Sequence, residues 1–249
     1  MIILDSLDKI SDRKTPIVLT IGNFDGVHLG HQKLLKSLKT SQEQKSLVTT
    51  FDPHPVKYFD VNKTFRRLFS TADQNKQMQL LDIDYLVRLK FDQSIAAMSY
   101  ELFLTQFTKN LNIQRIVIGH DLKIGKDRGG DRFSIKTWCQ NAGINFEVVE
   151  PLSIENQIVS STYIKQLVED NRFEVVPKFL GRPYSVNGII IHGDKRGRLI
   201  GFPTANLTRH RSLYVPHFGV YQTRTHWKNS TFDSITNVGK TPTFKTDDL

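Results

Sequence analysis

Two histidines three positions apart, His28 and His31, follow a short apolar run over residues 16–22. An apolar run of this length is typical of a buried parallel strand, and the leucines that come after it repeat with helical spacing. If a helix begins here, both imidazoles lie on one face of its first turn. They can then donate hydrogen bonds to phosphate oxygens, or stabilise charge that develops at phosphorus, without a covalent intermediate.

Glycines surround this histidine pair. The segment reads Gly22-Asn23-Phe24-Asp25-Gly26-Val27-His28-Leu29-Gly30-His31. Glycines let the backbone approach a ligand closely, while the first amides of a helix are unpaired and the helix dipole adds partial positive charge. In open parallel sheets, ligands bind at the carboxyl ends of the strands. We therefore expect an anion at this turn.

Strands and helices alternate over the first 170 residues. Further strands are expected at residues 46–51, 85–89, 115–118 and 146–149. Helices are expected from Thr71, with Gln74 as its capping-box partner, from Ser99 to Leu111, over 133–142 until Gly143, and from Ser161 to about Asp170. This alternation predicts an α/β fold with a doubly wound parallel sheet.

The pattern changes near residue 180. Short β-rich stretches at residues 184–191 and 219–224 are separated by glycine, proline and asparagine. They predict a small antiparallel barrel or sandwich. We therefore expect two domains, residues 1–180 and 181–249. A closed barrel from so short a piece is marginal, which favours an incomplete one.

Composition limits the class of protein. The chain has 249 residues, of which 39% are hydrophobic, and no repeat or low-complexity run, which excludes a fibre or a disordered chain. Its formal net charge of +9 favours anionic partners. Its single cysteine, Cys139, excludes an internal disulfide and argues against a cysteine zinc site. The N-terminus lacks the pattern of a signal peptide, and no apolar run approaches a membrane span. We expect a cytoplasmic protein without a membrane partner.

The form Gly-x-Phe-Asp-Gly-x-His-x-Gly-His resembles the HxGH nucleotidyltransferases, and within them the bacterial riboflavin kinase/FAD synthetase family. The resemblance implies a Rossmann-like domain that adenylylates FMN with ATP, forming FAD and pyrophosphate. It makes His28 and His31 the catalytic residues. It also implies that the nucleotide binds at Gly22, Phe24, Asp25, Gly26, Gly30, Ser160, Ser161, Thr162 and Lys165.

The last four of these residues belong to Val159-Ser160-Ser161-Thr162-Tyr163-Ile164-Lys165, which is similar to the family's Ile-Ser-Ser-Thr-x-Ile-Arg. Hydroxyls and amides at a helix start can hold a triphosphate, although serine and threonine there are also ordinary N-caps. Lys165 replaces the family's arginine. A bidentate grip on phosphate thus becomes a point charge, and we expect weaker binding.

Two other loops resemble the family's flavin-binding segments. Thr50-Phe51-Asp52-Pro53-His54-Pro55 is similar to Thr-Phe-x-Pro-His-Pro, and residues 119–125 are similar to Gly-x-Asp/Asn-Phe-x-Phe-Gly. The resemblance places the flavin beside Pro53, His54, Pro55 and Asp121. Leu122 and Ile124 stand where the family has aromatics, which keeps an apolar wall but removes ring stacking.

Residues 180–184, 192–198 and 201–207 resemble the riboflavin kinase module. The resemblance implies a loop for ATP phosphates with Gly193, Arg196, Gly197 and Gly201, and Mg²⁺ at Thr204 and Asn206, whose oxygens are hard donors. Family modules continue past the point where this chain ends, to a glutamate that acts as the base on riboflavin. We therefore expect little riboflavin phosphorylation, with a trimmed, frameshifted or disordered terminus left open.

Two other classes of function stay open. One is another HxGH transferase, acting on pantetheine phosphate or transferring a cytidylyl group, but the Phe-Asp-Gly lead-in, the Pro-His-Pro loop and the kinase-like segment argue against it. The other is a nucleic-acid-binding or flavin-sensing protein, supported by the net charge and by Lys195, Arg196 and Arg198. No stripe of interleaved aromatic and basic residues supports nucleic-acid binding. The expected partners are ATP and flavins, and self-association is left open.

Overall fold

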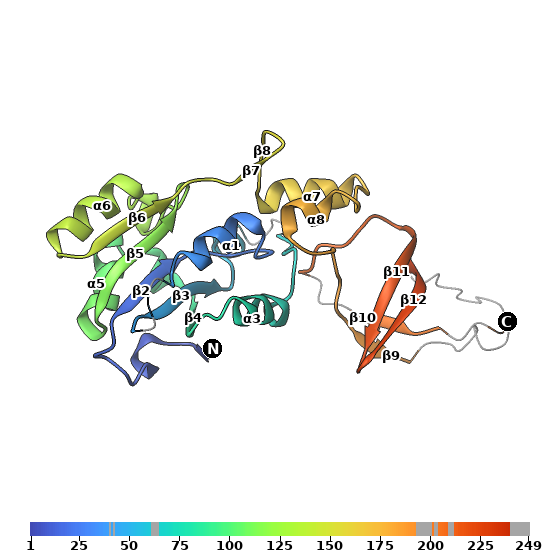
Figure 1. Ribbon diagram of the computed structural model, residues 1–249, viewed down its shortest axis with the longest axis horizontal. Coiled ribbons are helices and arrows are strands. Elements are labelled where there is room, and N and C mark those ends of the chain that lie inside the picture. Colours follow the sequence, from blue (N-terminus) through green and yellow to red (C-terminus); the bar gives the residue numbers. More distant parts are fainter. Residues whose placement is uncertain are drawn as a thin grey trace, which may run out of the picture.

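A computed structural model describes residues 1–39, 41, 43–60, 65–192, 201, 204–208 and 212–239 (Figure 1). Its centre is a six-stranded parallel sheet in the order β1-β4-β3-β2-β5-β6. The strands are β1 (Ile2–Leu4), β2 (Ile17–Ile21), β3 (Lys45–Asp52), β4 (Tyr85–Lys90), β5 (Ile113–Gly119) and β6 (Asn145–Val149). The strand order reverses between β2 and β5, and a ligand crevice is expected at the carboxyl ends of these two strands.

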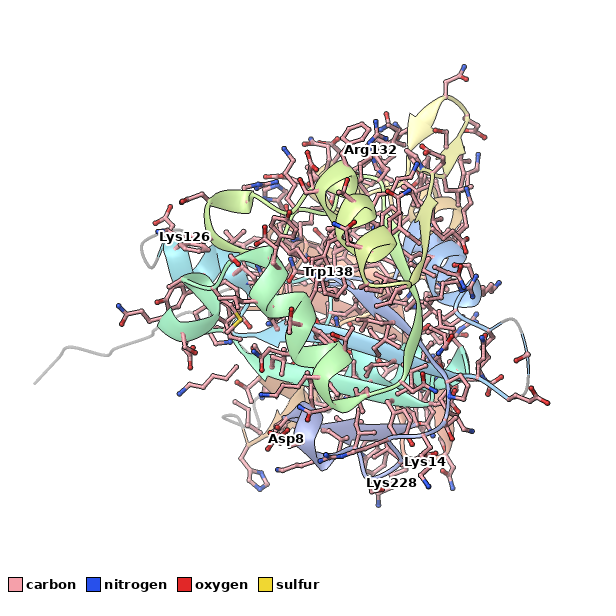
Figure 2. The ribbon with its side chains drawn as sticks, turned by 90° about the vertical axis from the view of Figure 1, so that its left-hand side faces the viewer. Asp8, Lys14, Lys126, Arg132, Trp138 and Lys228 are labelled. Carbon is pink, nitrogen blue, oxygen red and sulfur yellow. The ribbon has the colours of Figure 1, made fainter. Side chains whose placement is uncertain are left out.

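Helices cover both faces of this sheet. On one face, α5 (Tyr100–Asn110) and α6 (Arg132–Asn141) bury Phe107 and Cys139 against Leu19 of β2. On the other face, α1 (Leu29–Lys36) and α3 (Thr71–Leu80) pack against the neighbouring Val18. Successive residues of β2 therefore serve opposite cores, as the two-residue period of a strand requires. The prediction of a doubly wound α/β fold is confirmed. In Figure 2, α5 and α6 lie in front of the strands, and Trp138 is labelled on α6.

The start of α3 differs from the prediction. Its N-cap is Ser70, whose Oγ accepts from the amide of Asp73 at 3.1 Å while the Asp73 carboxylate accepts from the amide of Ser70 at 3.3 Å. The predicted capping box from Thr71 to Gln74 is therefore wrong by one residue. Gln74 is buried instead and donates to the carbonyl of Asn23 at 2.8 Å.

Several short elements have no counterpart in the prediction. They include the helices η1 (Leu7–Lys9), α2 (Pro55–Phe59), α4 (Gln93–Ala96), η2 (Lys126–Arg128) and α8 (Val176–Leu180), the hairpin strands β7 (Ser153–Ile154) and β8 (Gln157–Ile158), and the edge strand β1. The last predicted helix of the first domain is α7 (Ser161–Glu169). It packs with α8 and Leu68 in a third core. Figure 1 shows α7 and α8 between the large sheet and the C-terminal strands.

The C-terminal part is antiparallel, as predicted. Strand β9 (Ile189–Ile191) pairs with β10 (Asn206–Thr208), and β11 (Gly219–Trp227) pairs with β12 (Ser230–Val238). The strand predicted at residues 184–191 is confirmed only for its last three residues. Within the described residues past 180, the strands form two separate pairs and no closed barrel.

Backbone hydrogen bonds join the C-terminal part to the first 180 residues. The amide of Arg67 donates to the carbonyl of Ser212, and the amide of Tyr214 donates to the carbonyl of Arg67, both at 2.7 Å. The Tyr184 hydroxyl donates to the Tyr214 carbonyl at 2.7 Å. Division into domains at residue 180 stays a proposal. Among the described helices, none combines the length and apolar character of a membrane span.

Candidate active site

The turn between β2 and α1 carries the histidine pair. His28 is the N-cap of α1, and its Nδ1 accepts from the amide of His31 at 3.2 Å. Gly30 leaves room for this ring, because a Cβ there would lie 3.2 Å from the His28 Cε1 atom. Gly26 has a φ of +86°, which a residue with a side chain rarely adopts. The glycines thus allow a tight turn that brings the imidazole over the helix start.

The two imidazole rings lie against each other. Their centroids are 3.6 Å apart and their planes differ by 17°. The rings of Phe24 and His31 meet edge to face, with their centroids 5.3 Å apart. His31 Nδ1 is buried and forms no hydrogen bond with any described residue. The prediction that these histidines share a face is confirmed, while their catalytic role stays a prediction.

Burial keeps both rings neutral. It lowers the pKa of His28 to about 4 and the pKa of His31 well below its usual value, with the neighbouring His28 also opposing charge on His31. Because His28 Nδ1 accepts a hydrogen bond, its proton lies on Nε2. At neutral pH His28 therefore offers one uncharged N–H donor.

Asp25 joins three segments that are distant in sequence. Its Oδ1 accepts from the amide of Leu68 at 2.8 Å, and its Oδ2 lies 2.7 Å from the Nζ of Lys165. Its backbone carbonyl accepts from the Ser161 hydroxyl at 2.7 Å. The side chain is buried. Both carboxylate oxygens thus bind groups of the protein, and Asp25 holds the turn before α1 against the start of α7.

The N-terminus of α7 lies beside that of α1. The carbonyl of Val159 is 3.4 Å from the position that a Cβ on Gly30 would take. Ser160 is the N-cap, and its Oγ accepts from the amide of Tyr163 at 3.2 Å, so the ordinary capping role is confirmed for this residue. Thr162 is exposed on the first turn of α7. The two helix starts place partial positive charge on one region.

Two of the predicted flavin residues line a pocket of about 450 Å³. Its lining comprises Asp52, Pro53, His54, Lys57, Phe65, Arg67, Phe69, Ser70, Thr71, Ala72, Ser212 and Leu213. His54 is the N-cap of α2, in which Pro55 is the first residue, and its ring stacks on Phe65 at 4.0 Å. Burial lowers the pKa of His54 to about 4. Asp121 is exposed and does not line this pocket. Its negative charge raises the pKa of His28, against the larger lowering by burial.

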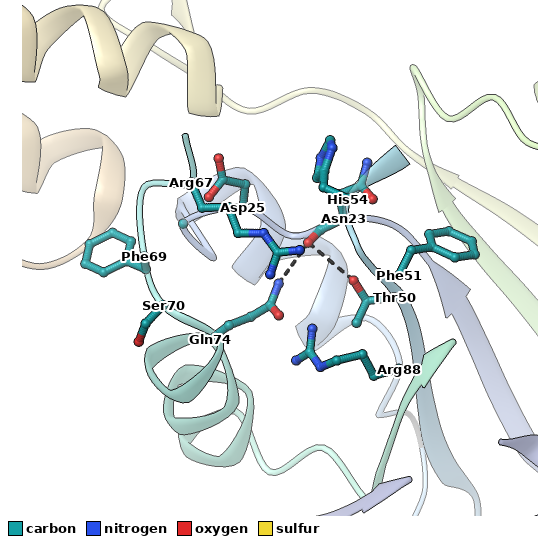
Figure 3. A pocket seen from close by; sticks show the side chains of 11 residues that line it. Asn23, Asp25, Thr50, Phe51, His54, Arg67, Phe69, Ser70, Gln74 and Arg88 are labelled. Carbon is teal, nitrogen blue, oxygen red and sulfur yellow. Dashed lines mark hydrogen bonds between the residues drawn. The ribbon is translucent and has the colours of Figure 1, made fainter. Parts of the chain in front are cut away.

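A smaller cavity beside Asp25 has room for about one water molecule, at about 10 Å³ (Figure 3). Thr50 and Gln74 both donate to the carbonyl of Asn23 there. Arg67 lies at the same cavity and pairs with Asp52 at 2.9 Å. Arg88 also lines it, and burial lowers its pKa. Sequence reasoning missed Arg67, Gln74 and Arg88; the adjacent pair Arg66-Arg67 was the one signal available.

Comparisons with known proteins identify the family. The FAD synthetase family model matches residues 10–163, and the riboflavin kinase family model matches residues 180–249. The chain belongs to the bifunctional riboflavin kinase/FMN adenylyltransferase family. The relative of that name from Bacillus subtilis is 36% identical over 243 residues, which cover 94% of this chain and 75% of the relative. The Escherichia coli K12 relative is 31% identical over 231 residues, which cover 91% of this chain and 74% of the relative.

A solved structure also matches nearly the whole chain. The crystal structure of a macrolide-efflux protein from Streptococcus pneumoniae superposes with a TM-score of 0.85 at 27% sequence identity. The match covers 98% of this chain and 80% of that protein. The fold assignment thus extends over both parts of the chain.

The residues of the riboflavin kinase match are described only in part. Gly193, Arg196 and Gly197 lie outside the described residues, as do Lys195 and Arg198. Thr204 and Asn206 are exposed, with Asn206 at the start of β10 opposite Ile191. Gly201 has a φ of +82°. Within the described parts of the chain, no three His, Cys, Asp or Glu side chains gather as metal ligands.

Proposed function

We propose that this protein transfers the adenylyl group of ATP to FMN, forming FAD and pyrophosphate. The observation that carries the proposal is the pair of neutral imidazoles, of buried His28 and half-buried His31, stacked where α1 begins, beside the start of α7. Family membership supports the same reaction, since the relatives are named FMN adenylyltransferases. No finding favours another HxGH transferase or a nucleic-acid-binding protein.

The reaction is an in-line displacement at phosphorus. An oxygen of the FMN phosphate forms a bond to the α-phosphorus of ATP, and the bond from that phosphorus to the bridging oxygen breaks. The electron pair leaves with pyrophosphate, so no side-chain nucleophile is needed. The Nε2–H of His28 and the ring of His31 would donate to the transferring phosphate. A donor held in place before reaction stabilises the developing charge without reorganisation.

The start of α7 would hold the triphosphate. Thr162 and the first amides of α7 are the groups best placed for it, because Ser160 and Ser161 already take part in capping and in the bond to Asp25. Lys165 would add positive charge nearby, although Asp25 balances it in the absence of nucleotide. Gly22, Phe24, Gly26 and Gly30 would shape the turn that the nucleotide contacts.

We propose that the flavin ring enters the 450 Å³ pocket beside Pro53 and His54. Pockets for small molecules have volumes of this order. Pro55 would fix the loop at the start of α2, and Asp121, in the loop after β5, would lie beside the flavin. The aromatic Phe65 provides a flat apolar wall, which a ring system prefers.

The hydroxyl of Thr204 and the amide oxygen of Asn206 fit Mg²⁺, which prefers hard oxygen donors and keeps several waters. We propose that they hold it in a riboflavin-kinase-like site with Gly193, Arg196, Gly197 and Gly201. Mg²⁺, when bound, would offset the negative charge of the polyphosphate. ATP and flavins are the proposed partners, and the cytoplasm is the proposed location.

One assay tests the function. The protein is incubated with ATP, Mg²⁺ and either FMN or riboflavin, and the flavins are separated by chromatography. We expect ATP-dependent FAD from FMN with an equal amount of pyrophosphate. Absence of FAD, together with turnover of pantetheine phosphate or of CTP, would assign the chain to a different transferase. Parallel retention on nucleic acid that falls steeply with salt would instead favour a binding protein.

A further inference from the structure

Arg182 reaches from the C-terminal side of α8 into the turn that carries His28. Its Nη2 donates to the carbonyl of Gly26 at 2.7 Å, and its Nη1 lies 3.3 Å from the carbonyls of both Val27 and Leu180. The guanidinium also lies over the ring of Phe69, 4.5 Å from its centroid. Burial lowers the pKa of Arg182 to about 10, so the group is still a cation at neutral pH.

These bonds fix the backbone immediately before His28. A peptide unit is planar, so holding the Val27 carbonyl also sets the direction of the His28 amide. Val27 is β-branched and has a φ of +42°, a strained conformation that persists only where surrounding contacts maintain it. The hydrogen bonds from Arg182 supply such contacts on both sides of Val27.

Neighbouring residues hold the same arrangement. The Nε2 of Gln32, on α1, donates to the carbonyl of Val27 at 3.0 Å and to the carbonyl of Leu180 at 3.2 Å. Gly181, with a φ of +80°, lets the chain pass close to α1, because a Cβ there would lie 2.8 Å from a methyl carbon of Leu29. The segment from Leu180 to Arg182 is therefore packed on the first turn of α1.

We infer that Arg182 is a positioning residue for adenylyl transfer: it holds the turn at Gly26 and Val27 so that the His28 ring faces the transferring phosphate. This inference rests on the proposed FMN adenylyltransferase function. Arg182 lies within the stretch matched by the riboflavin kinase model, not the stretch matched by the FAD synthetase model. The first residues of the kinase-like segment thus complete the adenylyltransferase site.

Arg182 holds this turn through the backbone, and its positive charge also helps to lower the pKa of His28. One face of its guanidinium covers Phe69, and its Nη atoms donate to three carbonyls. It does not line the 450 Å³ pocket. Loss of Arg182 should therefore lower the rate of the chemical step and leave flavin binding nearly unchanged.

The test compares Arg182→Ala and Arg182→Lys with Arg172→Ala, which removes an exposed arginine paired only loosely with Glu174. Each full-length variant is assayed for kcat, for KM of FMN and of ATP, and for Tm. We expect Arg182→Ala to lower kcat for FAD formation by about 10- to 100-fold with KM for FMN nearly unchanged, because small misplacements of reacting groups have effects of this size. Lysine cannot reach several carbonyls at once, so the kcat of Arg182→Lys should lie between those of wild type and Arg182→Ala.

Chemical rescue separates positioning from folding. Methylguanidinium at millimolar concentration should restore part of the kcat of Arg182→Ala and should not change Arg172→Ala. Wild-type kcat in Arg182→Ala would overturn the inference. The inference would also be overturned if the unfolded fraction of Arg182→Ala accounted for its whole loss of kcat and methylguanidinium restored none of it. If Arg182→Ala does not fold, the kcat values of Arg182→Lys and Gln32→Ala, each compared with wild type, decide the question. If the wild-type chain forms no FAD, the proposed function itself fails, which is a distinct outcome.

Discussion

The Nζ of Lys165 on α7 lies 2.7 Å from the Oδ2 of Asp25 in the turn after β2, although 140 positions separate the two residues. The Asp25 side chain is 9% exposed and the Lys165 side chain is 21% exposed, so water screens the pair only in part. Asp25 also accepts a hydrogen bond from the amide of Leu68. The pair therefore fixes the start of α7 against the histidine turn.

Breaking this pair from one side should destabilise the protein. In Lys165→Met the Asp25 carboxylate stays buried without its cation, and we expect the free energy of unfolding to fall by about 2–4 kcal/mol. Asp25→Asn should lose a similar amount, while the double variant should lose less than the sum, with a coupling of about 1–2 kcal/mol. Urea denaturation measures each value. Lys178→Met, which breaks an exposed pair with Glu155, is the control and should lose less than about 1 kcal/mol. Additive effects of Asp25→Asn and Lys165→Met would show that the two side chains act independently.

His31→Ala should abolish most FAD formation and leave FMN binding near normal. Removal of a fixed donor to the transferring phosphate lowers kcat by about 10²- to 10³-fold. His31 does not line the proposed flavin pocket, so FMN affinity, measured by flavin fluorescence, should change little. His31→Phe is the matched variant, because it keeps a ring against His28 but has no N–H. If His31→Ala stays within a few-fold of wild-type turnover, or His31→Phe restores full activity, the assigned catalytic role is wrong.

The stability of the protein should fall as the pH is lowered from about 6.5 to about 4. Burial lowers the pKa of both His28 and His54 to about 4 in the folded protein, whereas in the unfolded chain these groups titrate near 6.5. Between these values the unfolded chain binds more protons, so acid favours unfolding, by about 1.4 kcal/mol per pH unit for each histidine. The stabilisation is fully present above pH 6.5.

Asparagine variants test this pH dependence. His28→Asn and His54→Asn each retain an N-cap acceptor and remove one titrating ring, so each should make the plot of unfolding free energy against pH less steep. His226→Asn, at an exposed strand position, is the control for loss of a histidine. Parallel plots for His28→Asn and wild type would mean that the His28 ring is not buried in solution.

The parts of the fold that could be predicted are those in which local sequence and tertiary environment agree. All five residues of β2 are buried, so an apolar run was a sufficient signal, and Ser99 and Ser160 cap helices as their residue types suggest. Strand β1 was missed because two of its three residues are exposed and it is defined by pairing with the distant β4. The start of α3 was shifted because Ser70 and Thr71 are both acceptable caps, and burial of Gln74 decides between them.

The candidate site divides in the same way. His28 and His31 were predicted because three positions on one helix turn place them together. The pairing of Asp25 with Lys165 could not be predicted, since it depends on how α7 returns to the histidine turn. Arg182 was hidden for the same reason, in a segment assigned to the second domain. Contacts of this kind are set by the packing of the third core, which no local pattern encodes.

Filling the 450 Å³ pocket should block the flavin without affecting ATP. Ala72 lines this pocket on the first turn of α3, and an indole in its place would occupy volume that the proposed flavin ring needs. We expect Ala72→Trp to raise KM for FMN by about 10-fold or more, which corresponds to a loss of about 1.4 kcal/mol in binding, while KM for ATP stays near wild type. Gln79→Trp, at an exposed position near the end of the same helix, controls for the added aromatic surface. Equal KM values for FMN in Ala72→Trp and wild type would place the flavin elsewhere, with the loop of Asp121 as the next site to probe by substitution.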